Sequence, residues 1–153
     1  MKQLIILTSF FAFGCHLKAE DRMPVNRPKD FTLHYHLDGG MRYYSENINI
    51  SADSCVYNIN DGGKISHRVF TMSSKEMDDL YEMLRKNKFD KIEFTSKSKV
   101  YDRGGISIQA GWNKNPQQIL VSNSQMSFVK KNWLNEWEAI CRYLEKLVKI
   151  LPA

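Results

Sequence analysis

Two histidines, two residues apart, are the side chains whose types and spacing come nearest to a chemical site. His34 and His36 stand where apolar and polar residues alternate, so both imidazoles point to one face of a predicted strand, with Asp38 next on that face. Such groups can share a metal ion, but a zinc site needs three or four ligands. The sequence does not place the other histidines, His16 and His67. We therefore expect two solvated histidines and no metal.

The serines offer no clear nucleophile. Ser66, His67 and Asp61 contain the groups of a nucleophile, a base and an acid, yet no Gly-x-Ser-x-Gly turn surrounds any serine. We predict that the protein is not an enzyme and uses no cofactor. The alternative is a metal-binding protein or an enzyme that uses His34 and His36.

Cys55 and Cys141 form the candidate disulfide pair. In an oxidising compartment, a bond between them would close a long loop and stabilise the fold by about 4 kcal/mol. The alternative is two buried free thiols, because cysteine is among the most buried residue types. The sequence does not give the Cα spacing that a disulfide requires, so both alternatives stay open.

The first fifteen residues are arranged as an export signal. Lys2 and the α-amino group give a positive start, and the run from Leu4 to Phe13 carries no charge. An apolar helix of about ten residues rises roughly 15 Å, half of the roughly 30 Å core of a bilayer, so we expect no permanent span. We predict a signal peptide over residues 1–14 and an exported protein.

Cys15 is the predicted lipidation residue, because it follows small residues at the end of the apolar run. Ala12 stands where a lipoprotein signal usually has leucine, and Ala12 with Gly14 also satisfies ordinary signal peptidase. A membrane-anchored lipoprotein, a periplasmic protein and a secreted protein therefore all remain open.

The remaining chain has the size and composition of one folded domain. Hydrophobic residues make up 42% and aromatic residues 12% of the sequence, which argues against a disordered chain. Charges and two prolines between Glu20 and Asp30 predict a tether or an N-terminal arm over residues 15–30, ahead of a single domain over 31–151. The net charge is +5, but the basic residues are scattered and no recognition motif accompanies them, so we expect no nucleic-acid partner.

Two Asp-Gly-Gly sequences organise the first half of the domain as antiparallel hairpins. The first follows a segment whose apolar and polar residues alternate, as in a strand with one buried face. A three-residue loop at each Asp-Gly-Gly matches the apolar faces of the flanking strands. The predicted strand partners are Leu37 with Met41, Tyr35 with Tyr43, Ile59 with Ile65, Tyr57 with His67 and Cys55 with Val69.

Helical spacing replaces alternation after Ser73. Ser73 and Glu76 form a capping box, and the helix they begin runs to about Asn87. Two more strands follow near 106–110 and 118–122, and a long helix covers about 132–150. The order ββββ-α-ββ-α predicts an α+β fold: an antiparallel β-meander of about six strands with two helices packed on one face.

Trp112 is the candidate partner contact. It ends a predicted strand beside the polar turn at 113–116, so we expect its indole to be exposed. For Trp137 and Tyr43, by contrast, the periodicity predicts core positions.

Four features together resemble small exported, lipoprotein-like α+β domains of uncharacterised families. They are the leader that ends in Cys15, the glycine-turned hairpins, the capped helix ending in Lys88-Phe89, and the closing Trp-rich helix. The resemblance rests on pattern and implies no activity or site residue. We expect a non-enzymatic cell-envelope domain that binds an unknown protein or envelope component and meets the membrane only through a lipid on Cys15. A periplasmic inhibitor or immunity-type protein is a more specific alternative.

Overall fold

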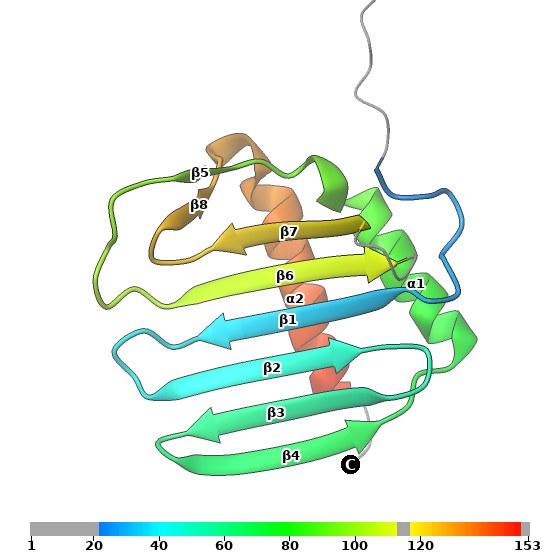
Figure 1. The fold of residues 1–153 in the computed structure, drawn as a ribbon, viewed down its shortest axis with the longest axis horizontal. Helices are drawn as coiled ribbons and strands as arrows, with labels where there is room; N and C mark the ends of the chain where they lie inside the picture. The colour runs from blue at the N-terminus through cyan, green and yellow to red at the C-terminus, as the bar shows by residue number, and fades with distance from the viewer. Residues whose placement is uncertain (1–21, 113–116, 151–153) are drawn as a thin grey trace, which may run out of the picture.

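Six strands pair into one antiparallel sheet, with the order β4-β3-β2-β1-β6-β7, and two short strands, β5 and β8, form a second sheet (Figure 1). The structure, a computed structural model, describes residues 22–112 and 117–150. The strands are β1 Thr32–Asp38, β2 Tyr44–Ile50, β3 Cys55–Asp61, β4 Lys64–Phe70, β5 Phe94–Ser96, β6 Gly105–Trp112, β7 Gln117–Asn123 and β8 Ser127–Val129. The helices are α1 Ser74–Lys86 and α2 Leu134–Ile150, with single 3₁₀ turns at Phe89–Lys91 and Lys131–Trp133.

This architecture confirms the predicted α+β class and the six-stranded antiparallel sheet. Both helices lie behind the sheet in Figure 1, so they cover one of its faces. The small β5–β8 sheet is an addition that the sequence analysis missed. The predicted signal peptide over 1–14, the lipidation residue Cys15 and the turn at 113–116 lie outside the described residues.

The core lies between the helices and the sheet. Each helix buries one stripe because its apolar residues recur every three or four positions, and each strand buries alternate residues. The fully buried side chains include Leu80 and Leu84 from α1, Ile140 and Leu144 from α2, and Leu33, Tyr35, Ile48 and Ile108 from the sheet.

The start of α1 is the predicted capping box. The Ser73 hydroxyl accepts a hydrogen bond from the Glu76 backbone N–H at 3.3 Å, and the Glu76 carboxylate accepts one from the Ser73 N–H at 2.7 Å. These two bonds satisfy backbone donors that the first turn of a helix leaves unpaired. The helix ends at Lys86 with Asn87 as its C-cap, as predicted.

The predicted register of the first hairpin is wrong. Leu37 pairs with Glu46 and Tyr35 with Ile48, so the connection is longer than three residues and Tyr43 is 71% exposed. Only this pairing places Ile48 on the buried face together with Tyr35. Burial of the β2 isoleucines outweighs the apparent match of Tyr43, because the isoleucines lie within a strand paired on both sides, whereas Tyr43 precedes the strand.

The second hairpin also differs from the prediction, by one residue. Asp61 pairs with Lys64, and the turn consists of Gly62 and Gly63 alone, with φ of 60° and 88°. Two consecutive positive φ angles are the mark of a type I′ turn, whose twist matches that of the strands it joins. The shift turns Ile65 outward, where it is 76% exposed.

The segment before β1 is not a free tether over its described part. Met23 is 2% exposed and belongs to the core. The Tyr81 hydroxyl donates to the Pro24 carbonyl at 2.9 Å, and Arg27 forms an ion pair with Asp78 at 2.7 Å. Residues 22–27 therefore pack along α1 as an N-terminal arm, the second of the two alternatives for this segment. Among the described helices, none combines the length and the apolar character that crossing a membrane requires.

Candidate binding surface

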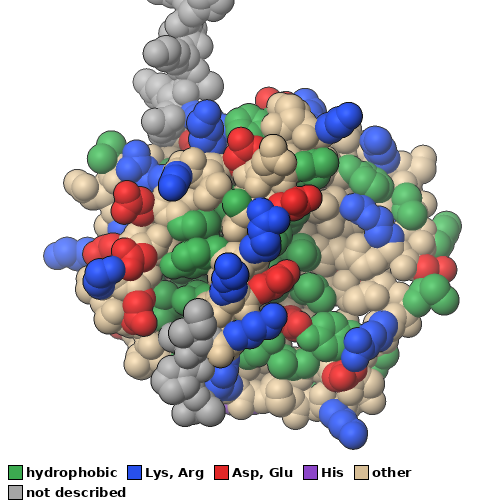
Figure 2. Space-filling model, turned by 180° about the vertical axis from the view of Figure 1, so that it is seen from behind, with side chains coloured by type: hydrophobic (Ala, Val, Ile, Leu, Met, Phe, Trp, Pro, Cys, Tyr) green, Lys and Arg blue, Asp and Glu red, His purple; other side chains and the backbone are tan. Residues whose placement is uncertain are grey.

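The sheet face opposite the helices carries almost no charge. Asp38 is the single charged residue among the described strand positions that point to this face in the six-stranded sheet. The other face of the molecule, seen in Figure 2, shows many basic and acidic side chains over the helices. The helix-free face is therefore a separate kind of surface, rich in amide, hydroxyl and imidazole groups.

His34 and His36 lie on this face, as predicted. The Nδ1 atom of His34 lies 2.5 Å from Oδ1 of Asn49, and that of His36 lies 2.8 Å from Oδ1 of Asn47. Each imidazole thus has a neutral amide on the neighbouring strand as its partner. Within residues 22–112 and 117–150, no group of three histidine, cysteine or acidic side chains is placed to hold a metal ion.

His67 belongs to the same face, on β4, and its Nδ1 lies 2.6 Å from Oδ1 of Asn58. Ser66 points to the opposite face of the strand, opposite Ile59 in β3. Asp61 is bound instead by Arg42, at 2.9 Å. The structure therefore does not bring Ser66, His67 and Asp61 together.

Trp112 is buried, with 5% of its surface exposed. The prediction of an exposed indole is wrong, because the strand β6 continues through Trp112 and its side chain turns to the helix-covered face. Trp112 is therefore a core residue, as is Trp137, for which the core position was predicted.

Cys55 and Cys141 are both buried free thiols, so the disulfide alternative does not hold in this structure. Cys55 begins β3, whereas Cys141 lies within α2. Burial raises the pKa of Cys55, and burial followed by the nearby Glu145 carboxylate raises the pKa of Cys141 to about 12. Neither thiol is set up as a nucleophile.

Loops gather at one end of the sheet and expose large apolar side chains. The β1–β2 connection, the segment before β6 and the turn between β7 and β8 lie along this end, at the left of Figure 1. We call it the loop-end surface. Its exposed apolar residues are Met41, Tyr43, Val100, Tyr101 and Met126, of which Met41, Tyr43 and Tyr101 are each more than 70% exposed.

Backbone hydrogen bonds connect these loops. The Val100 N–H donates to the Gln125 carbonyl at 2.9 Å, and the Lys97 N–H donates to the Met126 carbonyl at 3.0 Å. The Gly62 N–H donates to the Tyr43 carbonyl at 2.7 Å, which ties the β1–β2 connection to the next hairpin. The exposed side chains therefore stand on a framework of fixed geometry.

Arg103 joins the segment before β6 to the β7–β8 turn. Its guanidinium donates to Oδ1 of Asn123 at 2.6 Å and to the carbonyl of Ser124. It also lies 4.2 Å from the ring centre of Phe128, within cation–π distance. Because the Arg103 guanidinium packs against the Phe128 ring and also donates two hydrogen bonds, it holds the segment before β6 and the β7–β8 turn in one arrangement.

A cavity of about 380 Å³ opens where the loop-end surface meets the helix-free face. His36 and Ser107 line it from the sheet, and Lys99 and Met126 from the loops. Gly105 also lines it, and a Cβ atom there would come 2.6 Å from Cα of Ser124, so the β7–β8 turn packs directly against this glycine. The cavity offers an apolar wall, hydrogen-bonding groups and one ammonium, which suits recognition of a protruding side chain.

The exposed residues of the loop-end surface were not singled out as a surface from the sequence. Tyr43 was expected in the core and Met41 as the strand partner of Leu37, whereas Tyr101 and Met126 were not singled out. A usable signal was present for two of them: Met41 directly follows Gly40 and Tyr101 directly precedes Asp102, in turn sequences where a side chain is seldom buried.

No protein-family model matches this chain, and no curated protein matches it.

Proposed function

We propose that this protein is an exported domain of the cell envelope that acts without catalysis, by binding a protein partner through the loop-end surface. The observation that carries the proposal is the exposure of Met41, Tyr43 and Tyr101 on connected loops. Large apolar side chains that gather on one exposed surface are typical of sites that bind another protein. Tyrosine and methionine are also enriched where protein interfaces are most strongly buried.

The charge around these residues favours an acidic partner. Lys97 lies 5.3 Å from the ring centre of Phe128, and Lys99 lies 5.2 Å from that of Tyr101. Neither lysine forms an ion pair with an acidic side chain among the described residues. Together with the net charge of +5, they favour a partner whose acidic residues surround an apolar contact.

Site-directed photo-crosslinking tests the surface. A photo-reactive amino acid at position 43 or 101, in cells that export the protein, is expected to capture one protein that the same probe at Val69 does not. Val69 is a matched control, because it is an exposed apolar residue on the opposite edge strand, β4. The captured protein, once purified, should bind the wild type and lose at least about tenfold in affinity to Tyr101→Ala, as for an interface anchor.

Equal capture at Tyr43, Tyr101 and Val69 would contradict the loop-end surface as the binding site. So would unchanged affinity of Tyr43→Ala and Tyr101→Ala for the captured protein. Because both side chains are exposed, these variants are expected to fold, and circular dichroism checks this.

Export has its own test, an intact-mass measurement of the protein recovered from a bacterial host. Cleavage before Cys15 with added lipid mass would establish an anchored protein. A bare cleavage at Cys15 or near Ala19 would establish a secreted or periplasmic one. Retention of Met1 in a soluble cytoplasmic product would contradict export.

A further inference from the structure

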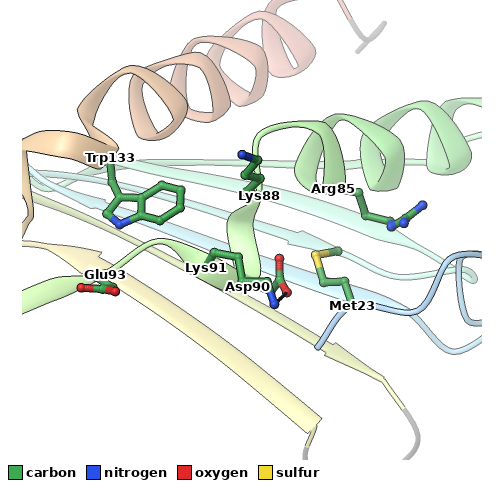
Figure 3. Close-up of a pocket in the computed structure, with 7 residues that line it drawn as sticks. All are labelled: Met23, Arg85, Lys88, Asp90, Lys91, Glu93 and Trp133. Atoms are coloured by element: carbon green, nitrogen blue, oxygen red, sulfur yellow. Dashed lines mark ion pairs between the residues drawn. The ribbon is translucent and has the colours of Figure 1, made fainter. Parts of the chain in front are cut away.

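A second cavity, of about 580 Å³, lies on the helix side of the molecule and shares no residue with the loop-end surface. The end of α1, the turn after it, the 3₁₀ turn before α2 and the N-terminal arm enclose it (Figure 3). Met23 and the Trp133 indole give it apolar walls. Its size is within the range of sites that hold small organic ligands.

The acidic side chains of this cavity already have cationic partners. Glu93 forms an ion pair with Lys130. The Asp90 carboxylate accepts the Arg22 backbone N–H at 2.9 Å and lies 3.5 Å from Nζ of Lys91. Both negative charges are therefore balanced from within the protein.

Lys88 adds a positive charge that no described acidic side chain pairs. It lines the cavity and extends from the end of α1 on the side of Trp133, whereas Arg85 extends toward the arm (Figure 3) and donates to the Val25 carbonyl at 2.8 Å. The cavity thus presents an available ammonium beside an indole.

The backbone at Lys88 has the left-handed conformation that commonly ends a helix. Its φ is 50° and ψ 43°, the left-handed conformation, directly after the C-cap of α1. This position favours glycine, because a side chain there is strained. Lys88 therefore offers a position at which glycine can replace the side chain without loss of the backbone conformation.

Trp133 supplies a further unmet group. Its indole N–H is buried and has no hydrogen-bond acceptor among the described residues.

We propose that this cavity binds a small monocarboxylate with an apolar body, its carboxylate on Lys88 and its body against Trp133 and Met23. A monocarboxylate with an apolar body fits better than a phosphate dianion, because Lys88 offers a single ammonium and Met23 and Trp133 offer apolar walls that phosphate cannot use.

Phenylacetate is the probe, added to the ¹⁵N-labelled protein while the indole N–H signals of its tryptophans are followed by NMR. The Trp133 signal is expected to shift saturably, while those of the buried Trp112 and Trp137 shift less. Neutral 2-phenylacetamide, of the same shape, should bind about fivefold more weakly, and so should inorganic phosphate.

Two substitutions of Lys88 separate binding from folding. Lys88→Gly is expected to stabilise the protein, since it relieves the left-handed strain, and yet to weaken phenylacetate binding about fivefold. Lys88→Gln should weaken binding similarly, whereas Lys86→Gln, an exposed lysine of the same helix end outside the cavity, should not.

The proposal is overturned if phenylacetate produces no saturable shift of the Trp133 signal at millimolar concentration. It is overturned equally if phenylacetamide or phosphate binds as tightly as phenylacetate, or if Lys88→Gly binds like the wild type.

Discussion

Gly40 lies against the backbone of Asp102, so that a Cβ atom at position 40 would come 2.6 Å from the Asp102 carbonyl oxygen. The contact joins the β1–β2 connection to the segment before β6, loops more than sixty residues apart in the sequence. Gly40 also has a φ of 68°, which a residue with a side chain rarely adopts. The arrangement of the loop-end surface therefore depends on this close approach.

Gly40→Ala is expected to lower the free energy of unfolding by about 2 to 4 kcal/mol, from backbone strain and from the collision with Asp102 together. Gly62→Ala is the matched control. Its φ of 60° imposes similar strain, but nothing lies within 4 Å of the added Cβ, so we expect a loss of about 1 kcal/mol. Urea unfolding measures both, and equal losses would show that the Gly40 contact has no energetic weight.

The capping box predicts a dependence of stability on pH. Hydrogen bonds from the Ser73 hydroxyl and N–H lower the pKa of Glu76. The carboxylate therefore stabilises the folded protein above its unfolded pKa of about 4.3, and this contribution is lost as the pH falls through the lower folded value. Glu76→Gln should flatten the stability profile between about pH 5 and pH 3 more than Glu82→Gln, an exposed residue of the same helix. Identical profiles for the two variants would exclude this role.

Ser73→Ala removes the other half of the box. We expect a loss of about 1 kcal/mol in the free energy of unfolding, because one backbone donor of α1 loses its acceptor. Ser74→Ala, one residue further along, is the control and should cost little. Thermal or urea unfolding measures the loss in each variant. An equal loss for Ser73→Ala and Ser74→Ala would contradict the role of Ser73 as the cap.

Glu46 is expected to control the ionisation of Tyr44. The Tyr44 hydroxyl donates to the Glu46 carboxylate, and this bond, followed by burial, raises the pKa of Tyr44 to about 12. Glu46→Gln should bring that pKa back toward 10, since a neutral amide no longer opposes the phenolate. Ultraviolet titration measures it. Tyr81 is the internal reference, because burial raises its pKa to about 12 without Glu46.

Cys55 and Cys141 are expected to resist alkylation in the folded protein. Burial keeps both as thiols, and the pKa of Cys141 is raised to about 12. Iodoacetamide at pH 8 should modify neither in native protein and both after unfolding in guanidinium, as mass spectrometry would show. Protection that persists in guanidinium and disappears with reductant would instead indicate a disulfide.

The elements that follow from local rules were predictable. Ser73 and Glu76 fix the start of α1 through bonds within four residues, and the spacing of Leu80 and Leu84 fixes its buried face. Alternation placed Leu33 and Tyr35 on the buried face of β1, and His34 and His36 opposite them. Each inference needed information from one short segment alone.

The strand registers and the exposed surfaces could not be predicted from the sequence, because they depend on contacts between distant segments. A Gly-Gly turn is compatible with more than one loop length, and the competition between Ile48 and Tyr43 for the core is decided across three strands. Trp112 looked exposed because its sequence neighbours are polar, but the strand carries it under the helices.

The sequence by itself determined both helices, the six main strands, the α+β class and the buried faces of β1 and α1, because periodicity and caps act over a few residues. Only the tertiary structure decided that Gly40 meets Asp102 and that Lys88 faces Trp133. Those neighbours come together only when the chain folds, because many residues separate them in the sequence. The strand register likewise depends on the pairing energy of the whole sheet, since the local sequence makes several registers equally favourable.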